Sequence, residues 1–319
     1  MMTDLLCVVI RGRSPGVKNL VLKTPVIAAS GTYGFGREYG EYVELQQLGG
    51  IAVKGLTADA REGNPVPRIV ETPMGILNSI GLQNPGIEGF IENELPWLRE
   101  SGTAVIANIS GNTPDEFVAM ATRLDEVQGV HALEVNVSCP NLHRGGEVFA
   151  TNPEMVEMIT AAVRKATSLP LIVKLSPNVT DIGLIAEKAE AGGADAVSLI
   201  NTVLGMAVDI QSQRPVLTNI FGGLSGPAVK PIALRQVWQV YDAVSVPIIG
   251  MGGISNAEDA LEFLMAGASA VSIGTGNFVN PRICVDVAAG IRAYMVEKGF
   301  TEVSQISGLA HHHARAQDQ

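Results

Sequence analysis

One pattern recurs along the chain and limits what it can fold into. An amphipathic stretch of helical periodicity ends in Gly or Ala-Gly, a short β-branched run follows, and the run stops at a polar residue or a glycine. Two copies, AGGADAVSLINT (191–202) and MAGASAVSIGTG (265–276), are nearly superimposable. Strands that alternate with helices in this way form a parallel sheet with helices packed on it.

The number of these runs indicates which parallel-sheet fold is present. The others are PVIAASG (25–31), GGIAVKG (49–55), TAVIANIS (103–110), ALEVNVSC (132–139), PLIVKLS (170–176) and VPIIGMGG (246–253). About eight buried strands in 319 residues match a (β/α)8 barrel. A doubly wound sheet is the alternative, but it usually carries a GxGxxG turn after its first strand, which GTYGFG (31–36) imitates only loosely. We therefore predict an α/β fold built as a TIM barrel.

The two ends of the chain lie outside the repeat. Residues 5–10 and 20–22 flank a Ser-Pro-Gly turn and predict a short N-terminal hairpin that closes one end of the barrel. Its short apolar run has the wrong charge order for a signal peptide. The C-terminal HHHARAQDQ is polar and without pattern. We predict one barrel domain over 1–310, with loop insertions at its C-terminal face, and a polar tail over 311–319.

Charge and cysteine content argue against several kinds of partner. The net charge of −10 disfavours nucleic acid and anionic membrane, and no apolar run approaches membrane-spanning length. Cys7, Cys139 and Cys284 are far apart and form no CxxC motif, so we expect neither a disulfide framework nor a zinc or iron–sulfur site on this chain. This usage suits a reducing compartment, and we expect a cytoplasmic location.

Polar residues and glycines stand where the predicted strands end. Active sites of (β/α)8 barrels lie at this C-terminal edge. Any one polar residue there is weak evidence, because strands meet solvent at their ends, but two lysines and three asparagines at successive ends indicate a site. The set is Ser30, Lys54, Asn108, Asn136, Cys139, Lys174, Asn201, Thr202, Gly252, Gly253, Gly274 and Thr275.

The residue types suggest what this site binds. Glycines end the last two strands, where barrels commonly hold a phosphate with backbone N–H groups. Asparagines offer donors and acceptors that suit a flat heterocycle whose edge alternates N–H and C=O. Lys174 can place a positive charge beside such a ring, or form an ion pair inside the barrel mouth. Cys139, considered alone, is more often a packing residue, because free cysteines are usually buried.

Seven motifs, in order along almost the whole chain, resemble those of class I dihydroorotate dehydrogenases. They are NSIGLQNPG (78–86), ANISG (107–111), EVNVSCPN (134–141), VKLSPN (173–178), LINT (199–202), GGLSGP (222–227) and IGMGGI (249–254). The segments GLQNPG and GLSGPAVKP are most similar to the type B, NAD-linked branch. Class II enzymes carry an N-terminal membrane segment and a serine base, neither of which this sequence shows. The resemblance implies an FMN-dependent TIM barrel that oxidises dihydroorotate to orotate in pyrimidine synthesis.

The resemblance also implies a role for each matching residue. Cys139 matches the catalytic base, which removes a proton from C5 of dihydroorotate while a hydride leaves C6 for flavin N5. A thiol suits this task because its ordinary pKa of ~8.5 lies close to cellular pH. The positions that hold orotate are Lys54, Asn78, Ser79, Ile80, Gly81, Leu82, Asn136, Asn201 and Thr202. Those that hold FMN are Ser30, Lys54, Gly55, Asn108, Asn136, Lys174, Ile200, Gly226, Gly252, Gly253, Gly274 and Thr275, with Lys174 near N1 and O2 of the ring.

The loop that follows Cys139, PNLHRGGEVFATNP (140–153), contains a Gly-Gly pair and lies where a lid would close over substrate. Its composition fits an ordinary mobile loop equally well. We favour the lid because proton abstraction must be screened from bulk water.

The type B resemblance implies partners as well. Electrons would leave FMN through another subunit that carries FAD and a [2Fe–2S] cluster and reduces NAD⁺, around a homodimer core of this chain. The alternatives are a type A enzyme that reduces fumarate, an aldolase or lyase that uses Lys54 or Lys174 as a Schiff-base nucleophile, and a non-catalytic barrel that scaffolds a partner.

Overall fold

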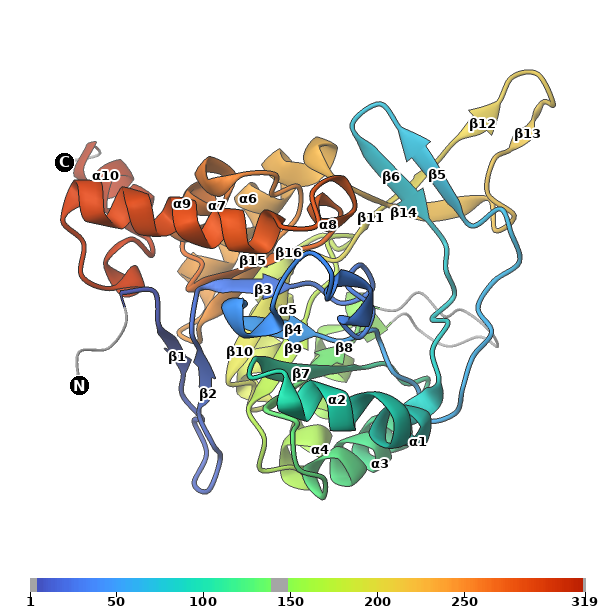
Figure 1. The fold of residues 1–319 in the computed structure, drawn as a ribbon, viewed down its shortest axis with the longest axis horizontal. Coiled ribbons are helices and arrows are strands. Elements are labelled where there is room, and N and C mark those ends of the chain that lie inside the picture. Colours follow the sequence, from blue (N-terminus) through green and yellow to red (C-terminus); the bar gives the residue numbers. More distant parts are fainter. Residues whose placement is uncertain (1–4, 139–148, 318–319) are drawn as a thin grey trace.

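Eight parallel strands close into a barrel in the computed structural model, which describes residues 5–138 and 149–317 (Figure 1). Each strand lies within one of the predicted runs, and β16 pairs with β3 to close the ring. The predicted TIM barrel is therefore confirmed. Its strands are β3 (Val26–Ala28), β4 (Gly50–Ala52), β7 (Ala104–Ile109), β8 (Ala132–Asn136), β9 (Leu171–Lys174), β10 (Ala196–Leu199), β15 (Ile248–Met251) and β16 (Ala270–Ile273).

Helices cover the outside of the barrel, and four of them begin with a side chain that caps the first turn. Thr113, Asn152, Asp181 and Asn256 each accept a hydrogen bond from the backbone N–H three residues later, which satisfies a donor that the helix leaves unpaired. The helices are α1 (Gly86–Gly89), α2 (Leu95–Glu100), α3 (Pro114–Asp125), α4 (Pro153–Ala166), α5 (Ile182–Ala191), α6 (Lys230–Ala243), α7 (Ala257–Met265), α8 (Gly276–Val279), α9 (Ile283–Lys298) and α10 (Leu309–Gln317).

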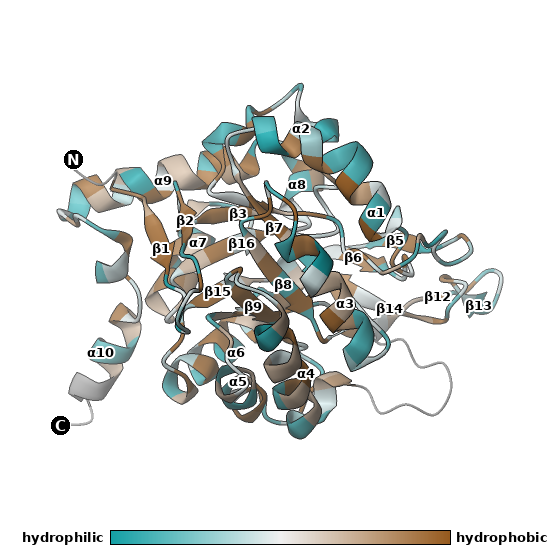
Figure 2. Ribbon diagram, turned by 90° about the horizontal axis from the view of Figure 1, so that it is seen from below, coloured by the Kyte–Doolittle hydropathy of each residue, from teal (hydrophilic) through white to brown (hydrophobic). Residues whose placement is uncertain are grey.

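An apolar floor fills the N-terminal end of the barrel. Alternate strand residues point inward, and Figure 2 shows the barrel strands as the most hydrophobic part of the fold. The hairpin of β1 (Val8–Ile10) and β2 (Leu20–Leu22) lies beneath this end, and its side chains join the same buried cluster. The predicted closing hairpin is thus confirmed. The floor consists of Ile10, Leu20, Leu22, Ile27, Ala52, Ala104, Ile106, Ala132, Ile172, Ala196, Ile249 and Ala270.

Two insertions meet at the opposite end, as predicted for the C-terminal face. One follows β4 and the other follows β10, and together they form an antiparallel sheet in the order β11-β14-β6-β5 (Figure 1). Its strands are β5 (Ile69–Thr72), β6 (Gly75–Asn78), β11 (Val203–Met206) and β14 (Phe221–Ser225), and the small hairpin of β12 (Val208–Asp209) and β13 (Arg214–Pro215) extends beyond it. The sheet brings two segments of the predicted site together, one before Asn78 and one after Thr202.

The C-terminal segment corrects the prediction of an unpatterned tail from residue 311. Residues 309–317 form α10, so the predicted boundary falls inside a helix. The His311 ring is buried, stacks on Trp238 with centroids 3.5 Å apart, and places Nε2 3.1 Å from the carbonyl oxygen of Ala266. Composition alone suggested a solvated tail, but an imidazole ring can pack flat on an indole while its nitrogen stays hydrogen-bonded.

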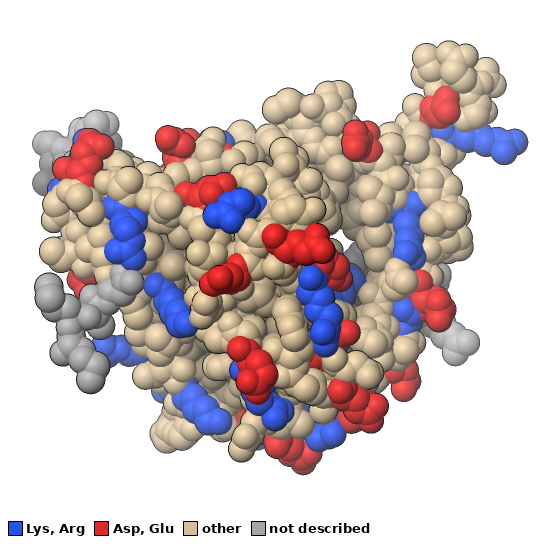
Figure 3. All heavy atoms as spheres, in the orientation of Figure 1, with Lys and Arg blue, Asp and Glu red and all other residues tan. Residues whose placement is uncertain are grey.

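The surface bears both signs of charge. Figure 3 shows acidic and basic side chains interspersed over the visible face. Among the helices of residues 5–138 and 149–317, none combines the length and apolarity needed to cross a bilayer.

Candidate active site

Above the apolar floor, the inward-facing positions of the barrel become polar. A strand residue two places beyond a floor residue points the same way. Four such residues, on β7 to β10, are less than a tenth exposed: Asn108, Glu134, Lys174 and Ser198. Burying polar side chains is costly unless they are hydrogen-bonded or await a ligand. This layer marks the mouth of the barrel as the candidate site.

Glu134 links two of these side chains. Its Oε2 accepts from Asn108 Nδ2 at 2.6 Å, and its Oε1 accepts from Ser198 Oγ at 2.7 Å. The Oδ1 atom of Asn108 is buried and has no hydrogen-bond partner within the described part of the chain. The mouth therefore contains an acceptor that no protein group satisfies there.

A hydrogen-bonded relay, Asn136–Ser138–Asn201, joins the ends of β8 and β10. Ser138 Oγ donates to Asn136 Oδ1 and accepts from Asn201 Nδ2. Asn201 Oδ1 in turn accepts from the backbone N–H of Thr202 at 2.8 Å. Because Asn136 Oδ1 accepts from Ser138, Nδ2 is the atom of that amide that remains for a ligand.

Two lysines lie at the same mouth. Lys174 is 5 % exposed, and its Nζ donates to Ser30 Oγ at 3.3 Å. Lys54 places Nζ 4.0 Å from where a side chain on Gly31 would begin, so it reaches the loop that follows Ser30. The structure thus brings Ser30, Lys54 and Lys174 to the ends of β3, β4 and β9.

The predicted substrate loop 78–82 is held by its neighbours. Asn78 Nδ2 donates to the carbonyl of Gly223, and a side chain on Gly223 would begin 2.0 Å from Thr202 Oγ1. Asn78 and Thr202 therefore both lie against Gly223. Asn64 Nδ2 donates to the carbonyl of Ser79 at 2.9 Å, and its N–H donates to the carbonyl of Ile80.

The end of this loop reaches the barrel mouth. Gly81 and Leu82 both have positive φ, 76° and 55°, a region that disfavours leucine. Asn84 uses its whole amide to hold the turn, donating to Leu82 O and Thr57 Oγ1 and accepting from the N–H groups of Thr57 and Gly86. The Leu82 side chain lies 3.5 Å from where a Cβ on Gly55 would stand, and that same point is 2.9 Å from Asn108 Oδ1.

The predicted phosphate glycines form a cup between β14, β15 and β16. Gly252 and Gly253 have φ of 128° and 76°, and a side chain on Gly253 would begin 2.8 Å from Lys230 Cβ and 2.9 Å from the carbonyl oxygen of Gly226. Thr275 Oγ1 donates to Ser225 Oγ at 2.7 Å, which ties the cup to the inserted sheet. Gly252 also lies against Ile200, and Gly274 lies against Ala29 and Thr32.

A pair of stacked tyrosines supports the loop after β3. The Tyr33 and Tyr39 rings lie 3.8 Å apart, and Tyr39 Oη donates to the carbonyl of Thr32 at 2.8 Å. Burial raises the pKa of Tyr39 to about 12, so the phenol keeps its proton at physiological pH. This fixes the segment that carries Ser30.

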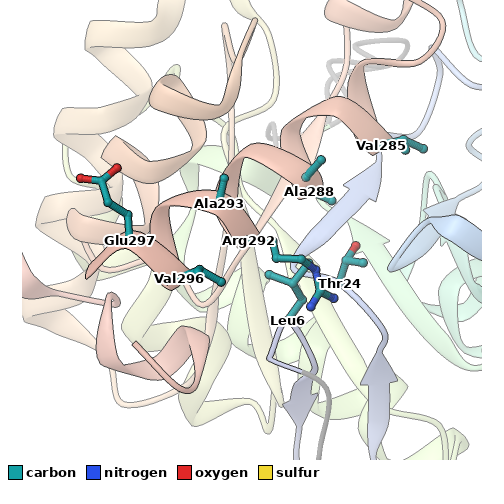
Figure 4. Close-up of a pocket in the computed structure, with 9 residues that line it drawn as sticks. Leu6, Thr24, Val285, Ala288, Arg292, Ala293, Val296 and Glu297 are labelled. Atoms are coloured by element: carbon teal, nitrogen blue, oxygen red, sulfur yellow. The ribbon is translucent and has the colours of Figure 1, made fainter. Parts of the chain in front are cut away.

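The predicted base, Cys139, lies outside the described residues, and so do residues 140–148 of the predicted lid. The last described residue before it is Ser138, which is buried at the barrel mouth. A cavity of about 670 Å³ elsewhere, between the N-terminal hairpin and α9 (Figure 4), is lined by Leu6, Val285, Arg292 and Val296 and contains none of the predicted site residues.

Several residues that shape the site were missed in the sequence. They are Glu134, Ser138 and Ser198 in the barrel, and Asn64, Asn84 and Asn178 in the loops. Asn178 Nδ2 donates to the carbonyl of Thr202 at 3.1 Å, and its Oδ1 accepts from Leu204 N. Only Glu134 gave a usable signal, because a carboxylate inside the buried run ALEVN needs a reason to be there.

Comparisons with known proteins give the family of this chain. A protein-family model described as "Dihydroorotate dehydrogenase" matches residues 14–295. A protein of Thermoanaerobacter pseudethanolicus named "Dihydroorotate dehydrogenase B (NAD(+)), catalytic subunit" is 58% identical over 292 residues, 92% of this chain and 96% of the relative. A protein of Desulforamulus reducens with the same name is 56% identical over 295 residues, 92% of this chain and 97% of the relative. The chain therefore belongs to the dihydroorotate dehydrogenase family of oxidoreductases.

Proposed function

We propose that this chain is the FMN-binding catalytic subunit of an NAD⁺-linked enzyme that oxidises (S)-dihydroorotate to orotate in pyrimidine synthesis. The overall reaction releases one proton and transfers a hydride equivalent to NAD⁺, so atoms and electrons balance. The observation that carries the proposal is the buried mouth of the barrel, where an unsatisfied acceptor, an amide donor and a lysine converge beside a glycine cup.

The residues at the mouth fit a flavin ring. The edge of an isoalloxazine alternates carbonyl oxygens with an N–H group, and Asn108 Oδ1 is a buried acceptor that such an N–H would satisfy. Asn136 offers the complementary donor. Lys174, 5 % exposed, would place a positive charge near the ring and favour its reduced, anionic form.

The glycine cup fits the phosphate of the cofactor. Gly226, Gly252 and Gly253 have positive φ, and the backbone crowds two of the positions where side chains would begin. Glycine is therefore required for these chain segments to pack this closely, and their backbone N–H groups would be the donors to an anion. The position between the last two barrel strands is where this fold commonly binds phosphate.

The loop 78–82, together with Asn136, Asn201 and Thr202, would hold the substrate ring and its carboxylate. Asn84 and Asn64 keep that loop in place. Cys139 would take the proton from C5 of dihydroorotate, since it follows Ser138 at the mouth and a thiol is a suitable base near neutral pH. FMN, when bound, supplies the acceptor for the hydride that leaves C6.

The route of the electrons rests on the relatives. Those proteins are named as NAD⁺-linked catalytic subunits, and such a name implies another subunit. We assign FAD and a [2Fe–2S] cluster to that partner, because three scattered cysteines on this chain cannot provide the usual four cluster ligands. A homodimer of this chain at the core of a heterotetramer, in the cytoplasm, completes the proposal.

The absorption spectrum of the purified chain is the first test. A yellow protein whose flavin bands bleach on anaerobic addition of dihydroorotate supports the function, whereas a colourless protein that binds no added FMN contradicts it. A Schiff-base aldolase would be colourless and would be trapped by borohydride with its substrate. A scaffold would give no signal with either dihydroorotate or orotate.

The electron acceptor is tested separately. The isolated chain is assayed with dihydroorotate and either fumarate or NAD⁺, and then with the purified partner subunit. NAD⁺ reduction that appears only with the partner supports the type B assignment. Rapid turnover with fumarate alone would instead place the chain in the type A branch.

A further inference from the structure

We infer that Glu134 is a positioning residue that decides which atom of Asn108 faces the ligand. This inference rests on the proposed function, since it concerns how the site recognises the edge of the flavin ring. Glu134 would touch neither substrate nor cofactor. It would act through the side chain of Asn108.

The contacts of Glu134 limit how Asn108 can turn. Both oxygens of the Glu134 carboxyl group accept a hydrogen bond. Asn108 donates through Nδ2 at 2.6 Å, and Ser198 donates through Oγ at 2.7 Å. No ion pair of Glu134 is found in the ranges 5–138 and 149–317, and these two neutral donors are its hydrogen-bond partners there.

The orientation of Asn108 follows from this bond. The last torsion of an asparagine side chain is soft, so an unconstrained amide could present either its oxygen or its nitrogen to a ligand. The bond from Nδ2 to Glu134 Oε2 selects one of these two orientations. Glu134 therefore holds the nitrogen of Asn108 and leaves Oδ1 toward the mouth.

A glycine leaves the room that Oδ1 occupies. A Cβ on Gly55 would stand 2.9 Å from Asn108 Oδ1, which is too close for a carbon. Glu134 and Gly55 thus have complementary effects, because one orients the acceptor and the other leaves room for it in the buried mouth. The ligand group that matches this arrangement is an N–H donor in a flat ring.

The second contact gives a matched control. Ser198 donates to the other oxygen of the same carboxylate, so Ser198→Ala removes one hydrogen bond of Glu134 while leaving its bond to Asn108. We expect this variant to lose less FMN affinity than Asn108→Asp does, because the hydrogen bond that orients Asn108 remains. In Glu134→Gln the amide oxygen can still accept from Asn108 while its nitrogen donates to Ser198, so the orientation of Asn108 is kept.

The decisive experiment reverses the direction of the Asn108 bond. In Asn108→Asp a second carboxylate faces Glu134, and we expect FMN affinity, measured by fluorescence titration of the apo chain, to fall by about tenfold to a hundredfold. In the double variant Asn108→Asp/Glu134→Gln, the glutamine nitrogen can donate to the introduced carboxylate, so an oxygen again faces the ligand. Affinity should return to within about tenfold of the wild type. The flavin midpoint potential should then become more negative, because the negative charge has moved closer to the ring.

Each outcome has one meaning. A double variant that binds FMN no better than Asn108→Asp or Asn108→Leu, with an unchanged melting temperature, would overturn the role of Glu134. If Asn108→Asp does not fold, the comparison of the double variant with Asn108→Leu decides, because leucine keeps the volume without an acceptor. A wild-type chain that binds no FMN would instead overturn the proposed function itself.

Discussion

Lys174 Nζ donates to Ser30 Oγ at 3.3 Å, which joins the ends of β9 and β3 although 144 residues separate them. Lys174 is buried, and a buried ammonium group is costly unless a counter-charge or ligand compensates it. Within the described residues no ion pair of Lys174 is found. An anionic or electron-rich ring bound at the mouth would supply that compensation.

Replacing Lys174 by Ala should therefore weaken FMN binding or slow flavin reduction while preserving the fold. We expect an effect of about tenfold or more, since hydrogen bonds to charged groups contribute about 1.5–3 kcal/mol. The measurements are FMN titration and anaerobic stopped-flow reduction. Lys188→Ala is the control, because Lys188 pairs with Glu157 on the outer helices. A colourless Lys174→Ala protein that has lost its helical circular dichroism would show a structural role instead.

Replacing Cys139 by Ser should slow reduction of the bound flavin by dihydroorotate at neutral pH. A serine hydroxyl holds its proton far more tightly than a thiol, and general bases typically contribute about 10²–10⁴-fold. The flavin content and spectrum should stay the same, because a base is not needed to hold the cofactor. Unchanged reduction kinetics would remove Cys139 from the mechanism and return it to a packing role.

The three cysteines should differ in their reactivity toward iodoacetamide. Burial raises the pKa of Cys284 to about 12, and its Sγ lies 3.4 Å from Asn277 Oδ1. A raised pKa makes the reactive thiolate rarer, so Cys284 should stay unmodified at pH 8 until the chain is denatured. Orotate should protect Cys139 while leaving the half-buried Cys7 unaffected, as read by peptide mass spectrometry. Rapid labelling of Cys284 in the native protein would contradict the burial.

Two glycines with the same φ allow the cost of backbone strain to be measured apart from the cost of steric crowding. Gly253 and Gly299 both have φ of 76°, but a Cβ on Gly299 would meet nothing within 4 Å, whereas one on Gly253 would lie 2.8 Å from Lys230 Cβ. Gly299→Ala should lower the free energy of unfolding by about 1–2 kcal/mol, the cost of the left-handed region. Gly253→Ala should cost roughly 1–3 kcal/mol more through overpacking, and it should also release FMN. Equal melting temperatures and full flavin content in both variants would contradict phosphate binding at the glycine cup.

Much of this fold could be predicted from the chain because its determinants are local. All eight barrel strands lie within the predicted runs, since each is a short apolar segment followed by a polar residue or a glycine. The alternation of inward-facing residues also places Lys54, Asn108 and Lys174 at one mouth. Strand periodicity and the rule for barrel active sites suffice for that step.

The remaining features depend on contacts between distant segments. Glu134 and Ser198 are 64 residues apart and meet only after the barrel closes. The Trp238 ring stacks on the His311 ring only when α10 packs against α6, so the sequence pattern by itself indicates no more than a tail at the end of the chain. Sequence pattern gives the direction of a side chain along its own strand, but not the identity of the group that it meets across the barrel.

The relay through Ser138 provides a last prediction. Ser138 Oγ donates to Asn136 and accepts from Asn201, so one hydroxyl orients two amides. We assign Asn201 to the substrate and Asn136 to both the substrate and the flavin. Ser138→Ala removes both bonds of the hydroxyl with little change in volume. Within the described residues, Asn136 Oδ1 then keeps only the backbone N–H of Ser138, and Asn201 Oδ1 keeps only that of Thr202, so both amides are held less firmly. We expect KM for dihydroorotate to rise by about tenfold, equivalent to ~1.4 kcal/mol, with FMN affinity within about threefold of the wild type.

The control for that relay is Ser101→Ala, an identical deletion at the end of α2, where the hydroxyl donates only to Leu98 O within the described chain. This variant should leave both KM and FMN affinity unchanged. Orotate binding measured by titration of the flavin spectrum separates substrate affinity from the rate of reduction. If Ser138→Ala bound orotate as tightly as the wild type but lost FMN, the relay would orient the cofactor, and Asn201 would have to be reassigned to it.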